Sequence, residues 1–114
     1  MQRSARGWCD VNEHQEKVDI LVREFGGYWG PFEMLAALVE EVGELADELL
    51  KVEGVKGTGE KEGLEEEIGD VVFALACIAN HYGIDLLNAL EKSVNKYRVR
   101  DKNRWGEPDE DIEG

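Results

Sequence analysis

Two pairs of acidic residues share a spacing that could hold a metal ion. Glu41 and Glu44 are three residues apart, and Glu67 and Asp70 repeat that spacing further along the chain. Residues three or four apart share one face of a helix, so each pair points in one direction. If the two helices pack antiparallel, the four carboxylates converge. Carboxylate oxygens are ligands that suit Mg²⁺ or Mn²⁺.

The segment that contains both pairs is strongly acidic. Residues 40–70 hold twelve acidic residues and three lysines, a net charge of −9. Carboxylates on one helix face repel one another, and partial desolvation increases the free-energy cost of placing them there. A divalent cation is the simplest cause of such a cluster. The other interpretation is that these helices present an acidic face to solvent.

The apolar periodicity predicts four amphipathic helices. They cover residues 12–25, 31–52, 60–82, and a fourth segment that starts near residue 85. Asn12 can cap the first helix, Pro31 suits the first turn of the second, and Asp85 can cap the fourth. Four such helices with short connections predict an all-α fold that resembles a four-helix bundle. At helical spacing, Glu41 shares a line with Met34 and Ala37, and Asp70 shares one with Ala74 and Cys77, so both acids lie beside the apolar stripes.

Several packing expectations follow from these helices. The apolar arc of residues 31–52 is wider than one bundle face requires, so we expect a second surface to cover it and the protein to form at least a homodimer. Gly43 and Gly69 lie inside helices, where glycine costs about 1 kcal/mol relative to alanine, so we expect close packing against their backbone. The other residues expected to be buried are His14, Val18, Leu21, Val22 and Phe25 in the first helix and Leu87, Leu90, Val94 and Tyr97 in the fourth.

The fourth helix concentrates positive charge. Residues 92–104 contain six lysines and arginines and one aspartate, a net charge of +5. This segment can neutralise the acidic helices, bind an anionic substrate beside a metal, or do both. Before the second helix, the glycine-rich turn at residues 26–30 carries Tyr28 and Trp29. Either these aromatics hold a flat ligand ring or they close the end of the bundle.

The whole chain has the properties of one acidic domain. It has 114 residues and a formal net charge of −13, which argues against non-specific binding to nucleic acids or membranes. It has no run of 18 apolar residues and no apolar signal-peptide stretch, so we expect a cytoplasmic protein. Cys77 is expected in the core. The expected divisions are a flexible arm at 1–10, the folded domain at 11–104 and an acidic tail at 105–114.

These residues resemble a known family. The sequence EEVGE at 40–44, followed by EIGD at 67–70, matches the EExxE…ExxD pattern of the all-α nucleoside triphosphate pyrophosphohydrolases. The surroundings are similar to the MazG branch of that family, from VNEHQEKV at the first helix through KYRVRDKNRWG at the end of the fourth. One departure is Arg98-Val99-Arg100 after Tyr97, where several relatives have a KYP ending.

The resemblance implies Mg²⁺-dependent hydrolysis of a nucleoside or deoxynucleoside triphosphate to the monophosphate and pyrophosphate, in nucleotide-pool cleaning or regulation. It also implies a homodimer or homotetramer in which both chains contact the substrate, with Mn²⁺ as a substitute metal. Glu40, with Glu41, would act in catalysis by orienting or deprotonating water, or Glu40 would hold a second metal. The metal ligands would be Glu41, Glu44, Glu67 and Asp70. The substrate contacts would be Lys92, Asn95, Lys96 and Tyr97, joined by Trp29 of the glycine-rich turn.

Three alternatives differ in what they require. A phosphoribosyl-ATP pyrophosphohydrolase carries out the same chemistry on a modified nucleotide, and the motifs do not exclude it. A di-iron bundle requires Glu-x-x-His, but neither His14 nor His81 has a glutamate three residues earlier. His14 is more simply a hydrogen-bonded residue at the core edge. An acidic helical dimerisation or regulatory module would have no catalytic activity, so metal-dependent pyrophosphate release would distinguish it from the enzyme.

Overall fold

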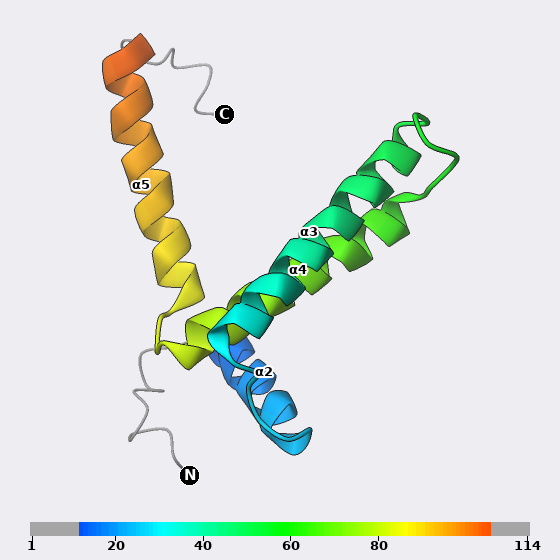
Figure 1. The fold of residues 1–114 in the computed structure, drawn as a ribbon. Helices are drawn as coiled ribbons and strands as arrows, with labels where there is room; N and C mark the ends of the chain where they lie inside the picture. Colours follow the sequence, from blue (N-terminus) through cyan, green and yellow to red (C-terminus); the bar gives the residue numbers. More distant parts are fainter. Residues whose placement is uncertain (1–11, 106–114) are drawn as a thin grey trace.

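The computed structural model describes residues 12–105, with the side chains of residues 12–102. This part of the chain contains four helices and no strand, which confirms the all-α prediction. The helices are α2 (Glu13–Glu24), α3 (Pro31–Val52), α4 (Lys61–His81) and α5 (Leu86–Trp105), as shown in Figure 1. The predicted arm at 1–10 and residues 106–114 of the tail predicted at 105–114 lie outside the described residues, whereas Trp105 is the last residue of α5.

The helix ends follow from local chemistry. Asn12 Oδ1 accepts a hydrogen bond from the backbone N–H of Gln15 at 2.9 Å, as predicted for the cap of α2. Pro31 is the first residue of α3. Asp85 Oδ1 accepts from the N–H groups two and three residues later, at 3.0 and 3.1 Å, and so caps α5. Gly83, with φ of 67°, supplies the left-handed conformation that ends α4.

The antiparallel pair of α3 and α4 forms the long arm of the molecule (Figure 1). Close contact to a glycine occurs near the connecting loop, where a Cβ atom on Gly63 of α4 would lie 2.6 Å from the side-chain Oε1 of Glu48 on α3. The sequence predicted that another part of the protein packs closely against the backbone at Gly43 and Gly69. That prediction is wrong within one chain. A Cβ atom at either position would meet nothing within 4 Å.

Helix α2 crosses the end of this pair and presents a polar face to it. Gln15 and Asp19 are its buried residues, with 1 % and 8 % of their surface exposed. The predicted apolar line is therefore wrong at several positions: His14 and Leu21 are exposed, and Phe25 is 81 % exposed. The physical reason is that Gln15 and Asp19 have hydrogen-bonding partners on other elements, described below. Burial of a polar side chain is tolerated when such partners are present.

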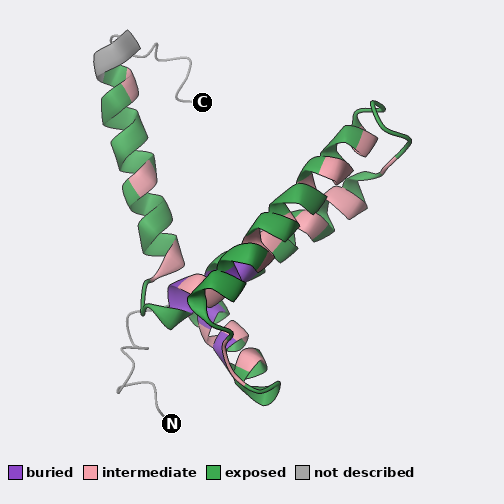
Figure 2. Ribbon diagram, in the orientation of Figure 1, coloured by how far each residue is buried: buried purple, intermediate pink, exposed green. Residues whose placement is uncertain are grey.

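Helix α5 leaves α4 at a bend of 104° and contacts it only near the turn. Figure 2 shows buried positions gathered where α2, α3 and α4 meet, whereas α5 is exposed along most of its length. The expectation that α5 buries its apolar stripe is wrong for the described part of one chain, in which no other helix lies opposite it. The exposed fractions are 54 % for Leu87, 59 % for Leu90, 42 % for Val94 and 45 % for Tyr97.

Within the described residues, the fully buried apolar core is small. It consists of Met34 from α3 and Ala74, Ala76 and Ala79 from α4. The wide stripe of α3 remains half-exposed, with Leu35 at 52 % and Val42 at 47 %. Among the described helices, none alone is long and apolar enough to cross a membrane, although the bent pair α4 and α5 meets that test when taken together.

Candidate functional site

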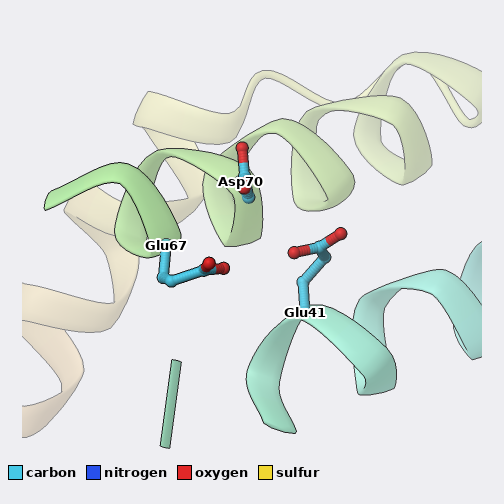
Figure 3. A group of neighbouring side chains, drawn as sticks. All are labelled: Glu41, Glu67 and Asp70. Carbon is cyan, nitrogen blue, oxygen red and sulfur yellow. The ribbon is translucent and has the colours of Figure 1, made fainter. Parts of the chain in front are cut away.

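A carboxylate cluster lies between α3 and α4. Glu41 on α3 and Glu67 and Asp70 on α4 each place one oxygen atom within 4.8 Å of the others. Figure 3 shows these three side chains and the helices that carry them. The antiparallel packing of α3 and α4 brings the two sequence motifs together. Three of the four carboxylates expected to converge therefore do so.

The cluster lacks local neutralisation. Among the ion pairs of the described residues, none involves Glu41, Glu67 or Asp70. Glu67 Oε1 is buried without a hydrogen-bond partner. A buried carboxylate oxygen without a donor is costly unless a cation or donor reaches it. The hard oxygen donors and this unpartnered atom fit a divalent metal ion.

Desolvation and neighbouring negative charge act on two of these carboxyls. Desolvation raises the pKa of Glu41, and the charges of Asp70, Glu44 and Glu40 raise it further. Desolvation also raises the pKa of Glu67, followed by the effect of Glu44 and then of Asp70 and Glu41. Each carboxyl therefore binds a proton more readily than usual, because protonation removes a repelling charge.

The two remaining acids of the EEVGE motif lie at the edge of the cluster. Both Glu40 and Glu44 are exposed. Glu44 is close enough to influence the pKa values of both Glu41 and Glu67, but it is not among the residues whose oxygens converge within 4.8 Å. An exposed side chain next to the cluster is free to turn toward a metal or a water molecule.

An apolar pocket of about 520 Å³ adjoins the cluster. Glu41 and Asp70 belong to both the cluster and the pocket wall. The predicted sharing of helix faces is confirmed here. Met34, Ala37 and Glu41 of α3 all line the pocket, and so do Asp70, Ala74 and Cys77 of α4. The aromatic residues of the wall are Phe25, Tyr28, Trp29 and Phe73.

The pocket corrects one prediction and adds residues that were missed. Cys77 is half-buried and lines the pocket instead of lying in the closed core. Trp29 is 63 % exposed beside the pocket, so its ring face is accessible to a ligand. Phe25 and Phe73 were not predicted as ligand-facing residues. The sequence feature that could have identified them is an aromatic side chain on the apolar face of a helix, but that feature is equally typical of a core residue.

The predicted substrate contacts on α5 lie on a different part of the molecule. Lys92, Asn95, Lys96 and Tyr97 are all exposed on α5. Lys92 borders a separate hollow at the α4–α5 turn, formed with residues 83–85, 88 and 89, and is not part of the apolar pocket. Lys96 and Arg100 both lie over the Tyr97 ring, at 4.8 and 4.5 Å from its centroid. One chain alone does not bring these groups to the carboxylates.

The fold and site define an all-helical protein whose carboxylates fit a divalent metal ion beside an apolar pocket. The chain belongs to the family of the MazG nucleotide pyrophosphohydrolase domain, whose model matches residues 30–105. The family resemblance expected from the sequence is thereby confirmed, and the protein is a nucleotide pyrophosphohydrolase.

Relatives extend this similarity over most of the chain. The uncharacterized protein YpjD of Bacillus subtilis (strain 168) is 42 % identical over 104 residues, covering 88 % of this chain and 94 % of YpjD. A crystal structure of YpjD from B. subtilis, a proposed pyrophosphatase, is also similar to this chain. Its TM-score is 0.67 and its sequence identity 40 %, and the match covers 75 % of this chain and 91 % of YpjD.

A second solved structure carries a more specific description. It is the Bacillus-conserved MazG protein, described as a nucleotide pyrophosphohydrolase. Its TM-score is 0.66 and its identity 40 %, with coverage of 80 % of this chain and 92 % of that one.

Proposed function

We propose that the protein hydrolyses a nucleoside triphosphate, ribo or deoxy, to the monophosphate and pyrophosphate with Mg²⁺. The observation that carries this proposal is the position of Glu41 and Asp70, which belong both to the carboxylate cluster and to the wall of the apolar pocket. A nucleotide has the matching arrangement, with a flat base at one end and phosphates at the other.

The pocket fits the base and the cluster fits the phosphate end. A volume of about 520 Å³ lies within the range of small-molecule sites. Trp29 offers an exposed ring for stacking, and stacking on an aromatic contributes about 1–3 kcal/mol per base in nucleic-acid complexes. With the base against Trp29, the α phosphorus can lie near the carboxylates.

Each carboxylate has a role in this arrangement. Glu41, Glu67 and Asp70 would hold Mg²⁺, with Glu44 turning in to complete the set when the nucleotide binds. The ion would neutralise phosphate charge and lower the pKa of water. Glu40 is exposed beside Glu41 and free to accept a hydrogen bond from the attacking water, which it would orient or deprotonate. Mn²⁺ would substitute for Mg²⁺ because both ions prefer oxygen ligands.

The far phosphates require positive groups that the pocket lining does not contain. The lining residues include no lysine or arginine. We propose that Lys92, Asn95, Lys96 and Tyr97 of a second copy supply these contacts in a homodimer or homotetramer. The exposed apolar stripe of α5 and the exposed stripe of α3 support this, because unpartnered apolar surface of this extent is typical of an interface.

The experiment that tests the function is a substrate screen. The eight standard triphosphates and phosphoribosyl-ATP are incubated with Mg²⁺, and monophosphate, pyrophosphate and orthophosphate are measured separately. We expect monophosphate and pyrophosphate in equal amounts from standard triphosphates. Orthophosphate as the primary product would reject the proposed reaction. Turnover of phosphoribosyl-ATP alone would assign that enzyme, and no turnover of any nucleotide would favour a regulatory module.

A further inference from the structure

A buried hydrogen-bond network adjoins the pocket, and of its residues only Tyr28 also lines the pocket wall. Its central residues are Gln15 on α2 and Asn80 on α4, with exposed fractions of 1 % and 2 %. Gln15 Nε2 donates to Asn80 Oδ1 at 2.9 Å, and Asn80 Nδ2 donates to the backbone oxygen of Gln15 at 3.0 Å. Because both side chains are fully buried, their polar atoms depend on partners inside the protein for their hydrogen bonds.

One branch of the network reaches the aromatic wall. Asn80 Nδ2 also donates to the Tyr28 hydroxyl oxygen at 3.1 Å, and that hydroxyl donates to Asp19 Oδ1 at 2.6 Å. Arg23 Nε donates to both oxygens of Asp19, at 3.1 and 2.9 Å. The Tyr28 ring is thus fixed at its hydroxyl end, and the next residue in the chain is Trp29.

The other branch reaches the start of α5. Gln15 Nε2 donates to the backbone oxygen of Ile84 at 2.8 Å, and Gln15 Oε1 accepts from the Leu86 N–H at 2.6 Å. Asn12 Nδ2 donates to Gln15 Oε1 at 2.7 Å and lies 3.4 Å from the α5 cap, Asp85. These bonds fix both sides of the turn at which α5 leaves α4 by 104°.

We propose that Gln15, Asn80 and Tyr28 are positioning residues, and that their shared network sets both the aromatic wall of the pocket and the direction of α5. Its functional consequence rests on the proposed function, in which the wall holds the base and α5 carries the phosphate contacts. The network itself touches neither the carboxylate cluster nor the reacting atoms. Its loss should therefore weaken substrate binding and leave the chemical step intact.

The first test removes one hydroxyl. Tyr28→Phe keeps the ring of the wall but removes the acceptor of Asn80 and the donor to Asp19. We expect KM for the best triphosphate to rise about tenfold, because binding must then order a wall that the hydrogen bonds no longer hold, while kcat stays within roughly twofold. Tyr82→Phe is the matched control, because Tyr82 is 57 % exposed and outside the network. An unchanged KM in Tyr28→Phe, or a fall in kcat alone, would overturn the proposal.

The second test requires no turnover. With Trp8 and Trp105 replaced by phenylalanine, the fluorescence of Trp29 reports on the wall. Gln15→Glu removes the donor to Asn80 and Ile84 at a residue that does not line the pocket. We expect acrylamide to quench Trp29 at a different rate in Gln15→Glu and in Tyr28→Phe, but at the wild-type rate in Tyr82→Phe.

The two tests separate failure of this proposal from failure of the proposed function. If wild-type protein releases no pyrophosphate from any triphosphate, the function is wrong, and the quenching measurement still tests the network. Unchanged Trp29 quenching in both folded network variants would overturn the positioning role. If Gln15→Glu does not fold, Tyr28→Phe alone decides, since it adds no charge and retains the ring.

Discussion

Glu41 on α3 and Asp70 on α4 place carboxylate oxygens within 4.8 Å of each other at the edge of an apolar pocket. The seam between the two helices therefore has a charged region and an apolar region that meet at these two residues. A molecule with a flat ring and a phosphate chain is complementary to both regions at once.

Mg²⁺ is expected to stabilise the protein against unfolding. Binding to the native state alone contributes about 2.7 kcal/mol at a concentration one hundred times Kd, and here it also relieves repulsion within the cluster. Glu67→Gln and Asp70→Asn should lose the Mg²⁺-dependent rise in Tm and most activity while remaining folded. Glu65→Gln, an exposed change on α4 outside the cluster, is the control. A Tm indifferent to Mg²⁺ with and without nucleotide, together with full activity of Asp70→Asn, would reject the metal assignment.

Glu40 is expected to act on water and not on the metal. General-base catalysis contributes about 10²–10⁴-fold, so Glu40→Gln should lower kcat within that range. The rise in Tm with Mg²⁺ should remain, because Glu40 is outside the converging oxygens. Thermal unfolding and steady-state kinetics on the same preparation check both parts. Loss of the Mg²⁺-dependent stabilisation would instead place Glu40 among the metal ligands.

Cys77 provides a direct probe of pocket occupancy. Burial raises the pKa of its thiol, so little thiolate is present at pH 7 and alkylation should be slow. In a Cys9→Ser variant, the alkylation rate should continue to rise with pH above about 8.5, where a free thiol is already half ionised. A triphosphate with Mg²⁺ should slow alkylation, measured by mass spectrometry. Equal rates of Cys77 alkylation with and without nucleotide would show that the base does not bind in this pocket.

The sequence predicted the helix ends and three of the carboxylates that lie together in the structure. Pro31 and Asp85 mark helix starts through short-range chemistry, which is why those boundaries are correct. Helical spacing alone predicts that Met34 and Glu41 share one face of α3 and that Asp70 and Cys77 share one face of α4, and all four residues line the pocket. The buried face of α2 was not predictable in this way, because Gln15 is buried through contact with Asn80, 65 residues away. Hydrophobic periodicity contains no information about such a pair.

The exposed stripe of α5 predicts assembly. A charge placed within a buried apolar interface is strongly destabilising, so Val94→Glu should dissociate a homo-oligomer. Val99→Glu is the matched control, since Val99 is also exposed on α5 but lies on a different helix face from Leu90 and Val94. Sedimentation velocity at micromolar concentration measures both variants against wild type. A monomeric wild-type protein with intact activity would refute assembly through this surface.

The position of the carboxylates relative to the pocket also predicts which phosphorus atom water attacks. With the base held against Trp29, the α phosphorus would be the phosphorus nearest the base and would lie next to Glu41 and Asp70. The β and γ phosphates would extend toward solvent and the α5 helix of the second copy. Hydrolysis in ¹⁸O-labelled water should therefore place one ¹⁸O atom in the monophosphate and none in the pyrophosphate. Mass spectrometry of both products after a single turnover distinguishes the two sites of attack. Label in the pyrophosphate would mean attack at the β phosphorus and would contradict this placement of the nucleotide.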